Sequence, residues 1–422
     1  MIRLSDDETG MLAGACGPAA ALSMRVILAA ARIQGAERLV PIDSAHVDSC
    51  LYHGPSSLDF ARTLLSGGGR VCVPTTLNVG GLDRSRPDLF AGPASHGEAA
   101  RQLMDCYVEM GCQPTFTCAP YQLPGRPAPG TDVAWAESNA IVFGNSMIGL
   151  RTNRYGDLID ICAAITGRVP HAGLHLPGNR AARALFTVER DALPRVDADL
   201  LPALLGHHVG RRTGTLIPVL DGLQTVPITE DWGKAFGAAA ASSGGVAMFH
   251  ILGATPEAPD LATATHGKRP VLTERVSAAD LTAAHRELTT ARWGEGGAPG
   301  ERLGAVSIGT PHLSSRQLGS LAAQLDGRHV RVPTYATTSR SVIASDPAAA
   351  EHLTAAGVTI IRDTCIYFQP DIIDPGAVVM TNSAKWAYYA PAKLGCTVIL
   401  ASQSDCIESA VSGETTLTSR HG

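Results

Sequence analysis

Two cysteines of this chain stand in short polar segments whose residue types could do chemistry. Cys118 lies within the segment Thr117 to Tyr121, and Cys365 directly follows Asp363 and Thr364. The two cysteines are far apart in the sequence, so only folding could bring them together. Paired thiolates bind metal ions, including the iron of iron–sulfur clusters. The sequence therefore indicates a polar active site, and the alternative is that both are ordinary buried thiols.

Other polar residues follow short apolar runs that resemble buried strands. We predict strands at 39–42 and 71–73, each leading into a polar loop. Such loops are where parallel α/β sheets contact ligands. The residues expected to face a substrate are Ser44, His46, Thr75, Thr76 and Asn78. Alternatively, His46 is a hydrogen-bonded core histidine, and the threonines and Asn78 form a plain turn.

The stretch 134–150 is apolar but carries a series of polar residues, which predicts a buried helix whose polar stripe lines a cavity. The polar residues of this stripe that we expect to bind substrate or support a metal site are Ser138, Asn139, Asn145 and Ser146. Arg151 and Arg154 follow and suit a carboxylate through bidentate pairing. The competing interpretation is a structural ion pair with Glu137 or Asp157.

Lysine is scarce, with only Lys234, Lys268, Lys385 and Lys393 in the chain. Lys385 stands in the polar run Asn382-Ser383-Ala384-Lys385 and is therefore a candidate catalytic residue. It could bind a carboxylate or transfer a proton, against the alternative of a salt bridge.

The composition limits the possible partners. A net charge of −5 and a pI near 6.3 argue against nucleic acid as a main partner. No segment reaches the roughly 18 apolar residues of a membrane helix. The N-terminus is acidic, unlike a signal peptide, so we expect a cytoplasmic location. Most of the ten cysteines should then be buried structural thiols.

The chain is long enough for several domains. We predict an N-terminal α/β region at 1–175, a middle region at 176–300, a C-terminal α/β domain at 301–413 and a polar tail at 414–422. Further expected elements include helices at 8–31, 94–111 and 277–292, and strands at 246–252, 305–308, 359–361 and 397–400.

The number and order of these motifs make the chain resemble the large catalytic subunit of the aconitase X family. The motifs on which the resemblance rests run almost end to end and lie at 41–46, 74–78, 117–121, 134–139, 145–154, 167–168, 242–257, 311–312, 363–365, 382–385, 389 and 406. The resemblance implies an aconitase-like α/β fold of several domains, with mostly parallel sheets flanked by helices.

It also implies a dehydratase with an iron–sulfur cluster. Known activities in the family are dehydration of cis-3-hydroxy-L-proline to Δ1-pyrroline-2-carboxylate and dehydration of mevalonate 5-phosphate. The family uses a small swivelling subunit, fused or separate, which this chain is expected to need as a partner. That subunit could supply the catalytic base.

Two positions favour the hydroxyproline branch over the archaeal, mevalonate 5-phosphate branch. Tyr155 follows Asn153-Arg154 where the archaeal type tends to have glutamate, and Thr310 replaces a cysteine before Pro311-His312. Threonine cannot be a thiolate ligand, so we expect a smaller [2Fe–2S] cluster held by Cys118, Cys365 and Cys406. Mevalonate 5-phosphate dehydratase is the alternative enzyme, and a cluster-binding scaffold without its own catalysis is the alternative of another class.

Overall fold

The computed structural model describes residues 2–291, 303–369 and 372–417. Its contacts divide the chain into two compact units. Unit 1 comprises 1–82, 93–181 and 255–257, and unit 2 comprises 83–92, 182–254 and 258–422. The end of the expected helix at 277–292, the start of the expected C-terminal domain at 301–302 and the last part of the expected tail, 418–422, lie outside the described residues.

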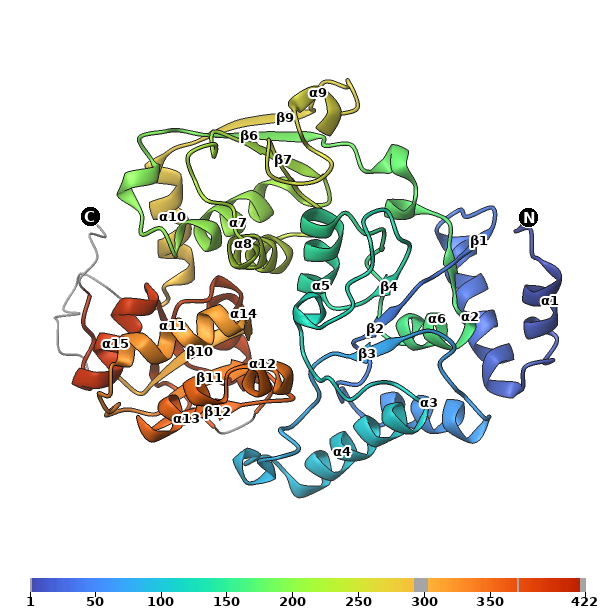
Figure 1. Cartoon of the computed structure of the whole chain (residues 1–422), viewed down its shortest axis with the longest axis horizontal. Helices are drawn as coiled ribbons and strands as arrows, with labels where there is room; N and C mark the ends of the chain where they lie inside the picture. Colours follow the sequence, from blue (N-terminus) through green and yellow to red (C-terminus); the bar gives the residue numbers. More distant parts are fainter. Residues whose placement is uncertain (1, 292–302, 370–371, 418–422) are drawn as a thin grey trace. The chain divides into compact units, whose positions relative to one another are not determined.

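Unit 1 has two small sheets packed with helices (Figure 1). Its elements are α1 (Asp6–Leu12), α2 (Pro18–Ile33), β1 (Leu39–Pro41), β2 (Ala45–Val47), α3 (Pro55–Ser66), β3 (Thr75–Leu77), α4 (Ala94–Glu109), β4 (Ala134–Trp135), α5 (Ser138–Phe143), α6 (Ile159–Thr166) and β5 (Arg168–Pro170). Strands β1 and β5 pair antiparallel, whereas β3, β2 and β4 form a parallel sheet in that order. Helix α6 packs on β2 and β4 and also contacts α2.

The first helix of unit 1 begins at its predicted capping box. Helix α1 starts with a capping box in which Ser5 accepts from the backbone N–H of Glu8 and the Glu8 carboxylate accepts from that of Ser5. The expected single helix at 8–31 is in fact two, because Gly14 and Gly17 both adopt positive φ angles between α1 and α2. Apolar residues recur at helical spacing in both α1 and α2, which is why the sequence suggested a single helix.

Two further expectations for unit 1 are wrong. Residues 71–73 are not a strand; the chain enters the sheet only at Thr75, after Pro74. The stretch 134–150 is not one helix, because Glu137 adopts a φ of 73°, which ends β4 and starts α5. A single π turn at Gly144–Ile148 then follows α5.

Unit 2 contains two parallel sheets, of four and five strands. The four-stranded sheet has the order β8-β7-β6-β9, and its elements with their helices are β6 (Ala184–Val188), α7 (Leu201–Thr213), β7 (Pro218–Asp221), α8 (Glu230–Ser243), β8 (His250–Ile251), α9 (Leu261–Ala264), β9 (Leu272–Val276) and α10 (Ala278–Leu288). The expected strand at 246–252 is therefore shorter than predicted. Helices α7 and α8 are rich in small residues, and at Gly206 and Gly210 an added side-chain carbon would collide with the backbone of α8.

The five-stranded sheet has the order β12-β11-β10-β13-β14. The elements are β10 (Ala305–Leu313), α11 (Ser315–Leu325), β11 (Thr334–Thr338), α12 (Arg340–Ser345), α13 (Pro347–Ala355), β12 (Val358–Ile361), β13 (Val378–Thr381), α14 (Ala384–Leu394), β14 (Thr397–Leu400) and α15 (Gln403–Ser412). From β10 the chain adds β11 and then β12 toward one edge of the sheet. From β13 it adds β14 at the opposite edge. Right-handed crossovers then place the connecting helices on opposite faces of the sheet.

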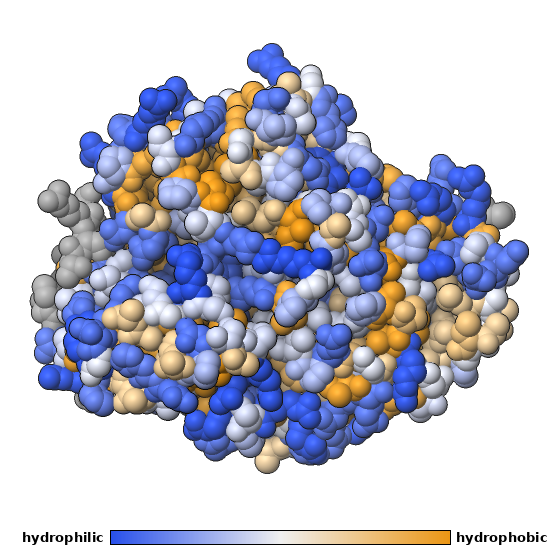
Figure 2. All heavy atoms as spheres, in the orientation of Figure 1, coloured by the Kyte–Doolittle hydropathy of each residue, from blue (hydrophilic) through white to orange (hydrophobic). Residues whose placement is uncertain are grey.

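Among the strands of the described residues, every pairing is parallel except that of β1 with β5, which confirms the prediction of mostly parallel sheets flanked by helices. A core cluster of unit 2 packs leucine, isoleucine and valine side chains from one face of the five-stranded sheet against α11, α13 and α15. Hydrophilic side chains make up most of the face seen in Figure 2, with hydrophobic ones scattered among them. Over the described ranges, no helix is long and apolar enough to cross a membrane.

Candidate functional site

In unit 1 the polar side chains gather at the carboxyl ends of β2, β3 and β4. Asp48 follows β2, Asn78 follows β3, and Glu137 follows β4 by two residues. Because the three strands are parallel and adjacent, their carboxyl ends lie at one edge of the sheet. This edge is the usual position of a ligand site in an α/β unit.

His46 lies within β2 and is fully buried. Its Nδ1 is 2.8 Å from the Thr76 hydroxyl on the neighbouring strand. Burial lowers the pKa of His46 to about 4, although the negative charge of Glu137 acts in the opposite direction. His46 is therefore a neutral imidazole at pH 7, and Thr76 is its hydrogen-bond partner.

Asp48 is a candidate that sequence reasoning missed. Its carboxylate accepts a short hydrogen bond from the Asn78 side-chain amide, and the residue is only partly buried. Burial, reinforced by the negative charge of Glu137, raises the pKa of Asp48 to about 7. A carboxyl group with a pKa near 7 can both accept and donate a proton at physiological pH. The strand predicted at 39–42 is present as β1, but β2 was predicted to be a loop, so Asp48 was not recognised as the residue that follows a strand.

The loop that carries Asp48 is held by Asp160 at the start of α6. The Asp160 carboxylate accepts from the backbone N–H groups of Asp48 at 2.7 Å, Ser49 at 2.9 Å and Ile161 at 2.7 Å. It also accepts from the Ser49 hydroxyl. Burial raises the pKa of Asp160, and the hydrogen bonds from Ser49 partly offset this effect. Asp160 is therefore a positioning residue for the loop after β2.

The remaining predicted residues at this edge differ in their surroundings. Ser44 is half-buried, and its hydroxyl has no hydrogen-bond partner among the residues described. The Thr75 hydroxyl donates to the backbone oxygen of Val73 at 2.8 Å. Ser138 donates to Glu137 at 3.1 Å and so belongs to the same polar edge.

Cys118 is buried and lies in a loop anchored to the end of β3. The N–H of Thr117 donates to the Leu77 backbone oxygen at 3.0 Å. The Asn139 amide donates to the backbone oxygen of Cys118 at 3.3 Å and to the Tyr121 hydroxyl at 2.7 Å. These contacts fix the loop conformation, so Asn139 supports Cys118 through its backbone.

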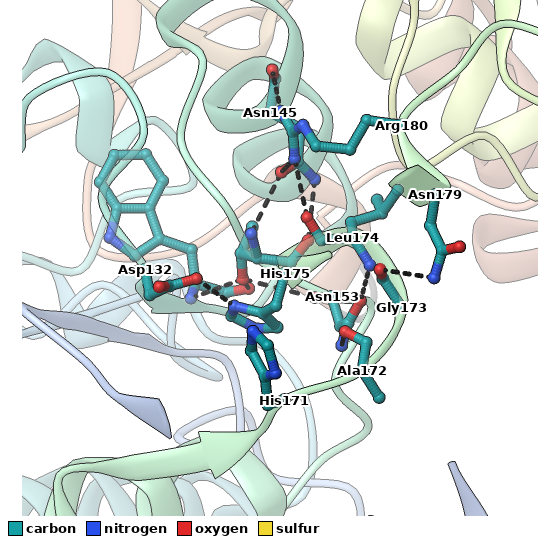
Figure 3. A network of polar contacts seen from close by, with 12 residues as sticks. Asp132, Asn145, Asn153, His171, Ala172, Gly173, Leu174, His175, Asn179 and Arg180 are labelled. Atoms are coloured by element: carbon teal, nitrogen blue, oxygen red, sulfur yellow. Dashed lines mark hydrogen bonds and ion pairs between the residues drawn. The ribbon is translucent and has the colours of Figure 1, made fainter. Parts of the chain in front are cut away.

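A second polar network of unit 1 centres on Arg180, which sequence reasoning also missed (Figure 3). Its buried guanidinium binds Glu257 through Nε at 2.9 Å and Nη2 at 2.6 Å, and donates to Asn145 Oδ1 at 3.2 Å. Asn145 in turn donates to the Thr152 backbone oxygen at 2.9 Å and accepts from the Thr152 N–H at 3.1 Å. Asn145, expected to bind substrate, thus has both side-chain polar atoms in a structural network.

The same network explains Tyr155, one of the positions that favoured the hydroxyproline branch. The Tyr155 hydroxyl makes a short hydrogen bond with Nε2 of His175. The Nδ1 of His175 is 2.7 Å from Asp132 (Figure 3). Tyr155 and His175 are both buried. A glutamate in place of Tyr155 would carry a second carboxylate into this buried chain of contacts.

The two predicted arginines lie in different settings. Arg151 is half-buried, whereas Arg154 is exposed. Asp157 contacts His53 at 3.8 Å. Among the described residues neither arginine forms the proposed ion pair with Glu137 or Asp157. Ser146 is buried in the π turn after α5.

In unit 2, Cys365 and His312 form a buried pair. His312 lies at the end of β10, and Cys365 follows β12. Their ligand atoms lie within 4.8 Å of each other, and His312 Nε2 is 3.3 Å from the Thr364 backbone oxygen. Thiolate and imidazole are both good ligands for iron. Sequence reasoning used His312 only as part of a motif, although Pro311-His312 stood directly after a predicted strand.

The segment before Cys365 is under backbone strain. Asp363 adopts a φ of 62° and is fully buried. Its carboxylate binds the Arg340 guanidinium, with Nε at 2.6 Å, and accepts from the Arg84 N–H at 3.2 Å. The charged partner and the backbone donor hold Asp363 in this conformation, which fixes the direction in which Cys365 leaves the strand.

Cys406 and Lys385 occupy other places in unit 2. Cys406 packs in the apolar core on α15, and burial raises the pKa of its thiol well above the usual value. Lys385 lies in the first turn of α14, and its side chain is almost fully buried. Neither placement tests the role that the sequence suggested.

Comparison with known proteins accounts for nearly the whole chain. Family models match the aconitase X first domain at 1–178, the second domain at 182–286 and the third domain at 303–412. The chain is 45% identical over 97% of its length to a cis-3-hydroxy-L-proline dehydratase of Pseudomonas aeruginosa, of which it covers 70%. It is 41% identical over 98% of its length to an enzyme of the same name from Hypocrea jecorina, of which it covers 69%.

More distant relatives have a different name. A phosphomevalonate dehydratase large subunit of Thermococcus kodakarensis is 33% identical over 92% of this chain and is itself covered to 94%. The crystal structure of Thermococcus kodakaraensis aconitase X in its holo form superimposes with a TM-score of 0.84 at 30% identity, covering 97% of this chain and 100% of that chain. The chain therefore belongs to the aconitase X family.

Proposed function

We propose that this chain is a hydro-lyase that removes water from cis-3-hydroxy-L-proline and yields Δ1-pyrroline-2-carboxylate. The observation that carries the proposal is the 45% identity, over 97% of the chain, to a dehydratase named for that substrate. The relatives named for phosphomevalonate are less similar, at 33% identity and below. Tyr155 and Thr310, which differ from the archaeal pattern, support the same choice.

We also propose that the enzyme holds an iron–sulfur cluster, as [2Fe–2S]. The donor set fits such a group, since the buried thiol of Cys365 and the imidazole of His312 lie within 4.8 Å of each other. Cys118 and Cys365 are the proposed thiolate ligands. Cys406 remains a proposed third ligand. Its surroundings are apolar, which favours His312 over Cys406 for that role. When bound, iron with an open coordination position would act as a Lewis acid on the substrate.

The reaction requires that a base remove the proton from carbon 2 while the hydroxyl group leaves carbon 3 and takes up a proton to become water. In the cis isomer these two groups lie on opposite faces of the ring, so an anti elimination is accessible. The enamine product then tautomerises to the imine. Asp48 suits the proton transfer, because its pKa of about 7 and its partly exposed carboxylate allow it to exchange a proton near neutral pH.

The other sequence-derived residues remain proposals for the same site. Ser44, His46 and Lys385 are proposed as catalytic residues. The proposed substrate-binding residues are Thr75, Thr76, Asn78, Ser138, Asn139, Asn145, Ser146, Arg151 and Arg154. The hydrogen bonds of Asn139 and Asn145 support positioning roles for these two.

We further propose that the chain works in the cytoplasm with a separate small subunit. The words "large subunit" in the names of the phosphomevalonate dehydratases support such a partner. All ten cysteines are free thiols, which agrees with a reducing compartment.

The test is anaerobic purification of the chain, alone and with a candidate small subunit, followed by assays on cis-3-hydroxy-L-proline and mevalonate 5-phosphate. We expect iron in the protein, turnover of the hydroxyproline, and loss of both in Cys118→Ser and Cys365→Ser. Cys16→Ser is the matched control, because Cys16 is exposed. Turnover of mevalonate 5-phosphate alone would refute the substrate. An iron-containing protein inert on both, with every small subunit offered, would indicate the scaffold alternative.

A further inference from the structure

Unit 2 contains a pocket at the point where its five-stranded sheet changes winding direction. The pocket has a volume of about 50 Å³ and lies beside the carboxyl ends of the adjacent strands β10 and β13. Its lining residues are Ala203, Lys234, Ala235, Ala238, Gly309, Thr310, Pro311, Leu313, Gln317, Asn382, Ser383, Ala384 and Lys385. In doubly wound sheets ligands bind in the crevice at this switch point.

Two of the side chains that line the pocket are cationic. The lining includes Lys234 and Lys385, two of the four lysines of the chain, and contains no acidic residue. The Lys234 ammonium already contacts Asp231 at 3.1 Å and donates to the backbone oxygen of His312 at 3.0 Å. These contacts hold Lys234 in the wall of the pocket. Lys385 is the second cationic residue of the lining, and it is largely buried. Ammonium groups in the lining can form charge-assisted hydrogen bonds with an anion.

The pocket also offers hydrogen-bond donors of the kind that anions need. Thr310 is only 5% exposed, and its hydroxyl has no hydrogen-bond partner among the described residues. Ser383, Ala384 and Lys385 place the N-terminus of α14 in the lining. The N–H groups at a helix N-terminus carry a partial positive charge and bind carboxylates and phosphates. A buried hydroxyl without a partner beside these donors indicates a missing acceptor.

The position of the Thr310 hydroxyl is fixed by its own backbone. The Ser383 hydroxyl, which caps α14 by accepting from the Trp386 N–H at 3.0 Å, donates a short hydrogen bond to the backbone oxygen of Thr310. The end of β10 and the start of α14 are thus joined directly. The donors from the two elements are consequently held on the same pocket before any ligand arrives.

We infer that this pocket binds the carboxylate group of the substrate, with Thr310, Lys385 and the N-terminus of α14 as the donors. A space of about 10–15 Å³ accommodates one water molecule, so about 50 Å³ accommodates the three heavy atoms of a carboxylate. The inference rests on the proposed function for the identity of the substrate. It adds Thr310 as a specificity-determining residue and gives Lys385 the task of binding rather than proton transfer.

The experiment measures binding of L-proline, which keeps the carboxylate but has no hydroxyl to lose, to the anaerobically purified enzyme by isothermal titration calorimetry. We expect L-proline to bind and L-prolinamide, which lacks the carboxylate charge, to bind at least tenfold more weakly. Thr310→Val should weaken L-proline binding about tenfold, the effect of losing one hydrogen bond to a charged group. Thr310→Ser should restore it, and Lys385→Gln should weaken it at least as much as Thr310→Val does.

Lys393→Gln is the matched control, because Lys393 lies exposed on the same helix and does not line the pocket. It should leave L-proline binding unchanged. Unfolding temperatures of all variants within a few degrees of the parent would exclude misfolding as the cause. Equal L-proline binding by Thr310→Val, Lys385→Gln and the parent would overturn the inference. Inorganic phosphate that binds more tightly than L-proline, in a manner that needs Thr310 and Lys385, would also overturn it in favour of a phosphate pocket.

The two proposals fail in different ways. If the enzyme does not dehydrate cis-3-hydroxy-L-proline but L-proline still binds with the expected dependence on Thr310 and Lys385, the proposed function is wrong and the carboxylate pocket stands. If dehydration occurs and neither variant changes L-proline binding, the proposed function stands and the pocket assignment is wrong.

Discussion

Replacing Asp48 by asparagine should stabilise this protein at pH 8 while it reduces the dehydratase activity. In the native state burial and the charge of Glu137 raise the pKa of Asp48 from 3.8 to about 7. Asparagine has nearly the same shape, can still accept from the Asn78 amide, and never needs to carry a charge in this setting. The variant therefore removes an ionisation cost and keeps the packing.

The sign and size of the effect follow from proton linkage. The folded state holds the proton of Asp48 more tightly than the unfolded state, so the parent loses stability as the pH rises from about 4 to about 7. At 1.36 kcal/mol for each unit of pKa, the loss is about 4 kcal/mol. Asp48 is partly exposed, and screening by water reduces the expected loss to about 2 kcal/mol. Below pH 4 the parent and the variant should differ little.

The assay is the free energy of unfolding by urea at a series of pH values between about 3 and 8, for the parent and Asp48→Asn. The stability difference should grow from near zero at the acid end to about 2 kcal/mol in favour of the variant at pH 8. Asp43→Asn is the control, since Asp43 is exposed in the same stretch and should show no such trend. A difference that does not change with pH, or a variant that is less stable than the parent at pH 8, would refute the reasoning.

Three further predictions concern other parts of the molecule. Between pH 6.5 and 4, His46→Asn should lose less stability than the parent. The buried His46, with a pKa of about 4, resists protonation in the folded state, whereas the histidine of the unfolded chain takes up a proton. Urea unfolding at pH 7 and pH 4.5 would measure the difference. Glu257→Ala should cost about 3 kcal/mol by leaving the Arg180 guanidinium buried without its carboxylate, and a variant as stable as the parent in thermal unfolding would contradict this. Lys234→Met should lower the iron content of the purified protein, because Lys234 donates a hydrogen bond to the backbone oxygen of His312. Lys268→Met, at an exposed lysine, should bind iron like the parent. Equal iron in both variants would show that the hydrogen bond from Lys234 does not support the iron site.

Much of the fold could be predicted because its signals are local. The capping box of Ser5 and Glu8 and the apolar spacing of α4 act within a few residues, so the sequence alone was enough. The prediction of a strand at 71–73 was wrong because an apolar run in the sequence does not identify the strand with which it would pair. The parallel partner β2 pairs with Thr75–Leu77 instead, and this register decides which side chains reach the site.

The candidate site shows the same division. The polar runs at 44–46, 75–78 and 137–139 were visible in the sequence, because burying so many polar groups in apolar surroundings needs a reason. Asp48 and Arg180 were missed because neither stands in such a run. Their importance comes from Glu137 and Glu257, residues distant in sequence, whose charges act only across space.

The sequence by itself determined the residue types available for chemistry, the family to which their order belongs, and the alternation of strands and helices that makes parallel sheets. These depend on identity and spacing along the chain. The tertiary structure decided which of those residues have a perturbed pKa, which have their polar atoms hydrogen-bonded in structural networks, and which line a pocket. A pKa depends on burial and on neighbouring charges, and a pocket depends on the meeting of β10 with α14, so both require side chains from separate segments to be placed side by side.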